Sequence, residues 1–261
     1  MGVPHRLGGK AKYKQSICLW AFAKAASVDE LIEEAVRLGI KGIELAPEEL
    51  WPKIKAAGLN ISTVAGHKSL TDGLNKRENH DRIEAELKEN IKKASEYGIP
   101  SLIVFSGNRN GLGDDEGIEI CAAGIKRVIK VAEDYGITLV MELLNSKVNH
   151  PDYQCDHTAW GVKLCQAVDS PRLKLLYDIY HMQIMEGDLI RTIKENIQYI
   201  GHFHTAGNPG RRDLDDEQEI NYPAVMRAIA ETGYDGYIGH EFVPKGDWRA
   251  ALKQAYDACD V

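Results

Sequence analysis

Residues 101–142 read SLIVFSGNRNGLGDDEGIEICAAGIKRVIKVAEDYGITLVME and contain two short apolar runs separated by a helical pattern. The runs Ser101–Phe105 and Thr138–Glu142 are almost continuously hydrophobic, which is typical of parallel strands buried on both faces. Between them, residues 117–135 have helical periodicity that ends at Gly136. The stretch therefore predicts a strand–helix–strand unit whose two strands run parallel.

The same alternation of strands and helices extends from Gln15 to the C-terminus. Ser27-Val28-Asp29-Glu30 has the pattern of a capping box, and Gly39 ends the helix that this box opens. The predicted strands are Ser16–Trp20, Lys41–Ala46, Asn60–Ala65, Ser101–Phe105, Thr138–Glu142, Leu173–Asp178, Gln198–Thr205 and Tyr237–Glu241. Eight strands, each followed by a helix, favour an α/β fold of the closed (β/α)8 TIM-barrel type. We expect residues 15–261 to form this single domain, after an N-terminal lead-in of residues 1–14.

An open, doubly wound sheet is the competing architecture for such an alternation. Its common nucleotide-binding forms carry a GxGxxG or GxxxxGK[ST] motif after an early strand. Neither motif follows an early strand here, and the glycine-rich segment Ser106–Gly113 lacks the lysine of a phosphate-binding loop. The barrel is therefore the favoured prediction.

The overall composition limits the kinds of partner. The 261 residues include 32 Lys and Arg against 39 Asp and Glu, a formal net charge of −7, whereas a nucleic-acid partner requires a basic surface. No stretch has the length and hydropathy of a membrane span, so we expect neither nucleic acid nor membrane as partner. The five cysteines form no CxxC pair, which is typical of buried thiols in a reducing compartment. A cytoplasmic location is predicted. The alternative is an exported protein whose signal peptide has been removed.

Acidic and imidazole side chains stand at the ends of four consecutive predicted strands. Glu142 ends the fifth strand, Asp178 the sixth and Glu241 the eighth, while the seventh carries His202 and His204. In a barrel, the C-terminal ends of the strands meet around one pocket. The two histidines are two residues apart and so face the same side of their strand; His204 is the predicted ligand because it is closer to the strand end.

This set of side chains predicts a divalent metal site. Carboxylates gathered in one apolar pocket repel each other and lose solvation, and a cation removes that penalty. Three carboxylates and one imidazole suit Mn²⁺ or Mg²⁺, with Co²⁺ or Zn²⁺ as alternatives. Glu142 and Glu241 are in addition the predicted catalytic pair. Placed on either side of a substrate carbon, they would move a proton through a cis-enediolate while the metal polarises the carbonyl oxygen.

Four segments make the sequence resemble a known family. They are LLYDIYHMQIMEGD over Leu175–Asp188, GHFHTAGNPGR over Gly201–Arg211, EINY over Glu219–Tyr222 and GYDGYIGHEF over Gly233–Phe242. Together they resemble the hydroxypyruvate isomerases of the xylose-isomerase-like TIM-barrel superfamily, which also includes ketose 3-epimerases. The loop over Arg211–Glu219 carries acidic residues where family members often carry glycines.

The resemblance implies an aldose–ketose isomerase of carbohydrate metabolism that acts on hydroxypyruvate or a related small keto acid or keto sugar. It implies the same four metal ligands, Glu142, Asp178, His204 and Glu241, and the same pair of catalytic glutamates. His181 and Arg211 match the family's contacts to substrate oxygens. Relatives form dimers or tetramers, so a homo-oligomer is expected.

Further side chains are candidates for the wall of the pocket. His67, at the end of the third predicted strand, is a candidate substrate-binding residue. Trp20, Phe22 and Trp51 could line a small-ligand site, as aromatic side chains commonly do.

Three other functions remain as alternatives. A ketose 3-epimerase would use the same metal and the same two glutamates, and would differ in the carbon that receives the proton. An endonuclease-IV-like phosphodiesterase would need several zinc ions, many histidines and a basic groove, whereas this chain has nine histidines and a negative net charge. A sugar-binding barrel without catalysis would not need two opposed carboxylates.

Overall fold

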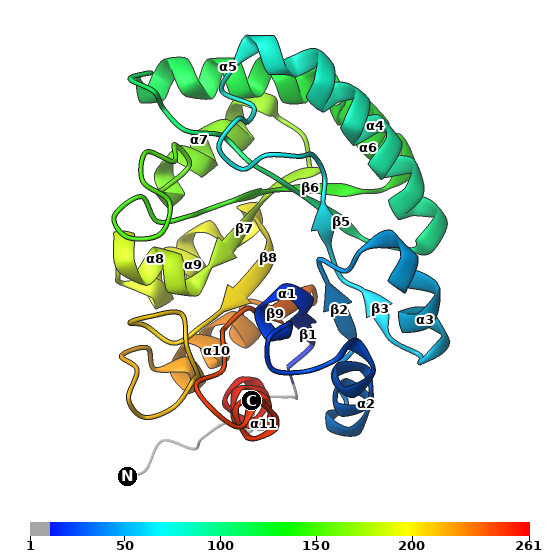
Figure 1. Ribbon diagram of the computed structural model, residues 1–261. Coiled ribbons are helices and arrows are strands. Elements are labelled where there is room, and N and C mark those ends of the chain that lie inside the picture. Colours follow the sequence, from blue (N-terminus) through cyan, green and yellow to red (C-terminus); the bar gives the residue numbers. More distant parts are fainter. Residues whose placement is uncertain (1–10) are drawn as a thin grey trace.

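The computed structural model describes residues 11–261, and its strands form one ring of parallel strands (Figure 1). The order of neighbours in the sheet is β3-β2-β1-β9-β8-β7-β6-β5-β4. The strands are β1 (Lys14–Cys18), β2 (Gly42–Glu44), β3 (Asn60–Ile61), β4 (Val64–Ala65), β5 (Ser101–Val104), β6 (Thr138–Glu142), β7 (Leu173–Asp178), β8 (Ile200–Thr205) and β9 (Tyr237–His240). Every pairing between neighbours is parallel.

The third predicted strand is divided into β3 and β4, which stand at the two ends of the sheet order. Only Ser62 and Thr63 separate them, and these two residues carry the chain across the break. The backbone N–H of Ser62 donates to the carbonyl oxygen of Ile43 on β2, and the hydroxyl of Thr63 donates to the carbonyl oxygen of Ser101 on β5. The ring is therefore continuous through this strand, and the predicted (β/α)8 TIM barrel is confirmed.

The helices surround this ring (Figure 1). They are α1 (Leu19–Phe22), α2 (Val28–Leu38), α3 (Trp51–Ala56), α4 (His80–Tyr97), α5 (Asp114–Lys126), α6 (Ile129–Tyr135), α7 (Thr158–Val168), α8 (Ile179–Met185), α9 (Leu189–Asn196), α10 (Tyr222–Glu231) and α11 (Trp248–Cys259). The predicted capping box of α2 is present, with Ser27 and Glu30 each accepting from the other's backbone N–H, and Gly39 ends the helix in the left-handed conformation. Within residues 11–261, no helix combines the length and apolarity needed to cross a membrane.

Several strands are shorter by one to three residues than predicted, and three further differences affect the elements near the site. The first strand ends at Cys18, because its pairing with β2 ends there, and Trp20 therefore lies in the helical turn α1. The helix predicted over 117–135 is divided into α5 and α6, because the N–H groups of Arg127 and Val128 bond to carbonyl oxygens three residues back. A short helix, α8, follows β7 without a loop, and Asp178 caps it by accepting the N–H of His181.

The N-terminal boundary of the domain is close to the predicted one. Residues 1–10 of the expected lead-in lie outside the described residues, and β1 begins at Lys14. Tyr13 is buried, and its hydroxyl donates to the carbonyl oxygen of Cys259 on α11. The N–H of Ala11 donates to the carbonyl oxygen of Val261. The last residues before β1 are thus bound to the C-terminal helix and its end.

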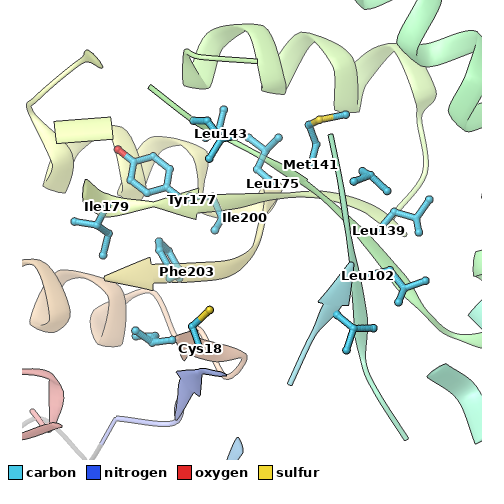
Figure 2. Close-up of a cluster of buried hydrophobic side chains, with 14 of the residues drawn as sticks. Cys18, Leu102, Leu139, Met141, Leu143, Leu175, Tyr177, Ile179, Ile200 and Phe203 are labelled. Atoms are coloured by element: carbon cyan, nitrogen blue, oxygen red, sulfur yellow. The ribbon is translucent and has the colours of Figure 1, made fainter. Parts of the chain in front are cut away.

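Side chains of the strands alternate between the helical layer and the interior of the ring. The outward set is apolar and packs against the helices; Figure 2 shows Leu139, Met141, Leu175, Tyr177 and Phe203 in this layer. Inside the ring, β5, β6 and β7 contribute a second apolar cluster of Ile103, Val140 and Leu176. The inward residues of β1, β2 and β8 at this depth are polar, as described below, so only one half of the barrel interior is hydrophobic.

Candidate metal and proton-transfer site

The carboxyl ends of β6, β7, β8 and β9 bring the four predicted metal-binding side chains together. One ligand atom from each of Glu142, Asp178, His204 and Glu241 lies within 4.8 Å of the other three. All four residues are buried, with at most 6% of any of them exposed. The convergence follows from the alternation of side chains along each strand, which turns the last inward residue of each strand toward the barrel axis.

The imidazole of His204 stands at the centre of this cluster. Its Nδ1 atom lies 3.0 Å from Oε2 of Glu241, 3.6 Å from Oε1 of Glu142 and 3.9 Å from Oδ2 of Asp178. Although buried, Nδ1 of His204 and Oδ2 of Asp178 have no hydrogen-bond partner among the described residues. A buried polar atom without a partner is costly. Unpartnered atoms that face each other within a group of carboxylates therefore fit the donor set of a divalent cation.

The three carboxyl groups differ in their affinity for a proton. Burial, together with the neighbouring Glu241, raises the pKa of Glu142. Burial also raises the pKa of Asp178 to about 7. Burial alone would raise the pKa of Glu241, but the positive charges of Arg211 and His204 outweigh it and hold that pKa well below its usual range. Glu142 and Glu241 thus have pKa values shifted in opposite directions, which is the arrangement that allows one carboxyl group to act as acid and the other as base.

Arg211 reaches the same cluster from the loop after β8. Its Nη2 atom forms an ion pair with Oε2 of Glu241 and lies 3.7 Å from Oδ2 of Asp178. Its guanidinium carbon lies 5.2 Å from the ring centroid of Trp20 and 5.9 Å from that of Tyr180. The backbone of Arg211 has φ of 58°, in the left-handed region. The guanidinium is thus located between two aromatic rings above the carboxylates, where the sequence predicted a substrate contact.

His181 faces Asp178 from the first turn of α8. Its Nδ1 atom accepts the backbone N–H of Asn145 at 3.1 Å and lies 2.6 Å from the side-chain nitrogen of Asn145. Two donors at Nδ1 place the ring proton on Nε2. Nε2 is buried, has no hydrogen-bond partner within residues 11–261, and lies 3.7 Å from Oδ2 of Asp178. The structure therefore provides an N–H donor beside the cluster. The ring of His150 packs against His181 in a tilted arrangement, with 5.3 Å between the centroids.

His67 is placed differently from the other predicted substrate contacts. Its Nε2 atom accepts the backbone N–H of Phe105 at 3.0 Å, so its Nδ1–H donates to the carbonyl oxygen of Lys68 at 2.9 Å. Both ring nitrogens are therefore used in joining the loops after β4 and β5. A substrate contact by His67 stays a prediction, and it would require one of these bonds to open.

The aromatic candidates separate into one site residue and two packing residues. Trp20 is 45% exposed, and its indole N–H donates to Oε1 of Glu241 at 2.8 Å. Phe22 is buried against Phe242, and the indole N–H of Trp51 donates to the carbonyl oxygen of Ala46. Only Trp20 among the three contacts the cluster.

A second buried cluster lies one layer below the first and was missed by the sequence analysis. Glu44 on β2 is fully buried, and its Oε2 atom lies 2.9 Å from Nε2 of both His202 and His204. The hydroxyl of Ser16 donates to Oε1 of Glu44 at 2.6 Å. Burial opposes the ionisation of Glu44, but the two imidazoles outweigh burial and hold its pKa below the usual range. The available signal was an acidic residue inside the apolar strand Lys41–Ala46.

A large surface crevice lies elsewhere. It has a volume of about 1120 Å³ and is lined by the loop 213–221 and by α11. Among the described residues, those that line it include none of the four clustered ligands. The carboxylate cluster is instead covered by Arg211 and its two aromatic neighbours.

Comparison with protein families gives one match that spans most of the chain. The family model described as "Xylose isomerase-like TIM barrel" matches residues 29–259. A human protein named "Putative hydroxypyruvate isomerase" is 25% identical over 244 residues, which cover 87% of this chain and 88% of that protein. The 2-oxo-tetronate isomerase of Cupriavidus necator is 37% identical over 117 residues, covering 45% of this chain and 44% of the relative.

Solved structures with the same fold cover nearly the whole chain. The AP endonuclease, family 2, from Brucella melitensis superposes with a TM-score of 0.80 at 23% identity, covering 93% of this chain and 96% of that one. A D-psicose 3-epimerase superposes with a TM-score of 0.74 at 20% identity, covering 94% and 96%. At these identities the likeness concerns the fold alone.

Proposed function

The chain belongs to the xylose isomerase-like TIM-barrel family, and we propose that it is a divalent-metal-dependent isomerase of a small keto acid or keto sugar. The observation that carries this proposal is the position of Glu142 and Glu241. Both are buried, and each presents a carboxylate oxygen to the same imidazole nitrogen of His204. Two carboxylates around one point can remove a proton from a substrate carbon and return it elsewhere. The names of the relatives, hydroxypyruvate isomerase and 2-oxo-tetronate isomerase, support the substrate class.

The donor set for the metal is Glu142, Asp178, His204 and Glu241. The two unpartnered atoms, Nδ1 of His204 and Oδ2 of Asp178, support their use as ligands. A bound cation of the Mn²⁺ or Mg²⁺ type would polarise the substrate carbonyl and stabilise negative charge on its oxygen. Three oxygen donors and one nitrogen favour these two ions over Zn²⁺, which prefers sites richer in histidine or cysteine.

The protein groups then perform the proton transfer. One of the two glutamates takes the proton from the carbon next to the substrate carbonyl, and the electron pair of the broken C–H bond enters a cis-enediolate. Return of a proton to the neighbouring carbon, together with transfer of the hydroxyl proton from one enediolate oxygen to the other, interconverts aldose and ketose. Arg211 presents a forked donor for a carboxylate or a carbonyl–hydroxyl pair, and the Nε2–H of His181 is placed to donate to a substrate oxygen near Asp178.

A ketose 3-epimerase is the second candidate function. It requires the same two glutamates, with the proton removed from one face of a carbon and returned to the opposite face. The similarity in fold to a D-psicose 3-epimerase favours including ketohexoses among the test substrates.

A substrate panel with defined metal content tests the proposal. The metal-stripped protein, reconstituted with Mn²⁺ or Mg²⁺, is assayed with hydroxypyruvate, 2-oxo-tetronate, D-psicose and D-fructose in D₂O. Isomerisation incorporates deuterium at the carbon next to the one that loses its proton. Epimerisation incorporates deuterium at the same carbon, whose configuration is inverted. Glu142→Gln and Glu241→Gln should each lower turnover by about 10²- to 10⁴-fold, the usual range for a general acid or base.

The matched control is Glu231→Gln, which changes a glutamate on α10 whose partner is Lys194 on the outside of the barrel. Its turnover should equal that of the wild type. Unchanged turnover in Glu142→Gln, in a preparation whose wild type is active, would reject the proton-transfer role. A cytoplasmic location and assembly into a homo-oligomer remain predictions from the sequence.

A further inference from the structure

The floor of the site contains a carboxylate that the proposed proton transfer does not use. Glu44 is 0% exposed and projects from β2 into the barrel interior, below His204. It accepts hydrogen bonds from two imidazoles and one hydroxyl, those of His202, His204 and Ser16. All three donors are themselves buried, with at most 1% of any of them exposed. An ionisable group so deep in a fold is rare unless it is fully paired.

The direction of these hydrogen bonds fixes which nitrogen of His204 carries the proton. A carboxylate only accepts hydrogen bonds, so Nε2 of both histidines must donate to Oε2 of Glu44. In the neutral ring of His204, the lone pair is then on Nδ1. Nδ1 is the atom that lies between the oxygens of Glu142 and Glu241. The carboxylate of Glu44 therefore determines that His204 turns the lone pair of Nδ1 toward the upper cluster.

The facing polar atoms of the lower cluster are all hydrogen-bonded to one another, unlike those of the upper cluster. Glu44, His202 and His204 also have ligand atoms within 4.8 Å of one another. However, the facing atoms of this trio, Oε2 of Glu44 and the two Nε2 atoms, are all in hydrogen bonds. Among the described residues, the buried atoms without a hydrogen-bond partner in this region lie in or beside the upper cluster: Nδ1 of His204, Oδ2 of Asp178 and Nε2 of His181. The lower trio thus fits a hydrogen-bonded support better than a second cation site.

The strand two places from β2 in the sheet leaves room for the carboxylate of Glu44. A Cβ atom built on Gly239 of β9 would lie 1.9 Å from Oε1 of Glu44 and 2.6 Å from its carboxyl carbon. No real side chain tolerates such a contact, so any residue larger than glycine would displace the carboxylate. Gly239 thus leaves the space that the carboxylate of Glu44 occupies under His204, and the hydroxyl of Ser16 fixes the carboxylate there by a hydrogen bond.

From this geometry we propose that Glu44 is a positioning residue of the metal centre, which holds His204 in the tautomer and orientation that turn Nδ1 toward Glu142, Asp178 and Glu241. The inference rests on the proposed function, because it assigns a role relative to the metal of that same site. When a metal-binding histidine donates the N–H of its other ring nitrogen to a carboxylate, this hydrogen bond raises the basicity of the ligand atom and limits rotation of the ring. Loss of such a partner commonly weakens metal binding by about 10- to 100-fold.

Mn²⁺ binding to the full-length, metal-stripped protein tests this role independently of turnover. Free Mn²⁺ is measured by electron paramagnetic resonance during titration of wild type and Glu44→Gln. The variant should bind Mn²⁺ about 10- to 100-fold more weakly. The control is Glu34→Gln, which changes another buried glutamate, paired with Arg37 on the outer helix α2; its Kd should equal that of the wild type.

A second measurement reports the ring directly. In the diamagnetic Mg²⁺-loaded protein with ¹⁵N-labelled histidine, the spectrum of the wild type should show His204 with its proton on Nε2 and with Nδ1 bound. This pattern should be lost or become mixed in Glu44→Gln, a change that a purely structural role would not produce. If Glu44→Gln does not fold, Ser16→Ala replaces it, because loss of one hydrogen bond to the carboxylate should weaken Mn²⁺ binding by about 5-fold.

The possible results separate this inference from the proposed function. Equal Mn²⁺ affinity in wild type and Glu44→Gln, or in wild type and Ser16→Ala where only that variant folds, overturns the inference. A wild-type spectrum with the proton of His204 on Nδ1 also overturns it. Weaker binding in the variants together with no activity on any panel substrate supports the role of Glu44 and rejects the proposed isomerase. A wild type that binds no Mn²⁺ rejects both.

Discussion

The indole nitrogen of Trp20 donates a hydrogen bond of 2.8 Å to Oε1 of Glu241, and thereby joins the helical turn after β1 to the residue that follows β9. The other carboxylate oxygen of Glu241 forms an ion pair with Arg211. Both oxygens of one glutamate are therefore held by fixed donors. Because Trp20 is 45% exposed, its ring also forms an accessible edge of the site.

Replacement of Trp20 by phenylalanine should lower kcat/KM by about 10-fold, because it keeps an aromatic wall but removes a hydrogen bond to a charged group, which contributes about 1.5 kcal/mol. Steady-state kinetics on the substrate accepted in the panel measures this effect. Trp160→Phe is the matched control, because the indole nitrogen of Trp160 is buried on α7 and has no hydrogen-bond partner in the part of the chain that the structure describes. Equal kcat/KM in Trp20→Phe and wild type would show that this hydrogen bond does not assist the reaction.

Replacement of Arg211 by lysine should raise KM and lower kcat/KM by about 10- to 100-fold, since an ammonium group keeps the charge but loses the forked, planar donor set and its stacking between two rings. The adjacent Arg212→Lys provides the control. Arg212 is exposed and donates only to the carbonyl oxygen of Val243, at 3.4 Å. An Arg211→Lys variant with wild-type kinetics would exclude a specific substrate contact by the guanidinium.

The sequence was sufficient for the architecture and for the upper layer of the site because both depend on repeated local patterns. Apolar runs predicted the buried parallel strands, and the last residue of a strand such as β7 is a position that any barrel turns toward one pocket. Asp178 could therefore be placed near Glu142 without knowledge of any distance.

The lower layer could not be predicted in the same way. Glu44 bonds to His202 and His204 from 158 and 160 residues away in the chain, and no local pattern indicates which side chains share a layer of the interior. Likewise, the stacking of Arg211 between Trp20 and Tyr180 depends on the course of the loop after β8. Such contacts are set by tertiary packing rather than by the neighbours of each residue in the sequence.

Replacement of Gly239 by alanine should destabilise the protein by about 1–3 kcal/mol, the usual cost of placing an additional methyl group in a packed interior. The added Cβ would lie 1.9 Å from Oε1 of Glu44, so the carboxylate must move away from His204. Urea unfolding measures the change in stability, and Mn²⁺ titration should show weaker binding in the same variant. Gly246→Ala is the control, since nothing lies within 4 Å of a Cβ built at Gly246. Equal destabilisation by the two substitutions would contradict the packing argument.

The contribution of Asp178 to the stability of the metal-free protein should fall as pH rises from about 5 to about 7. Burial raises the pKa of Asp178 from 3.8 to about 7 in the folded protein, so over this range the folded state holds a proton that the unfolded state has released. Stability then falls with rising pH, by up to about 1.4 kcal/mol per pH unit for one group. Glu142 and His204 also have raised pKa values and act in the same direction. Four histidines with lowered pKa values act in the opposite direction over this range: His67, His150, His181 and His240. Glu241, whose pKa is lowered, acts in the opposite direction but only at more acidic pH.

Thermal unfolding in the presence of a chelator, at several pH values between 5 and 8, measures this dependence. Asp178→Asn removes the titrating group, so its stability should rise more, or fall less, with increasing pH than that of the wild type. The exposed loop substitution Asp216→Asn should leave the slope unchanged. Mn²⁺ should restore the most stability to the wild type at the highest pH, because a cation competes with protons for the same carboxylates and imidazole. Equal slopes in the wild type and Asp178→Asn would show that the buried carboxyl of Asp178 is not protonated in the folded state.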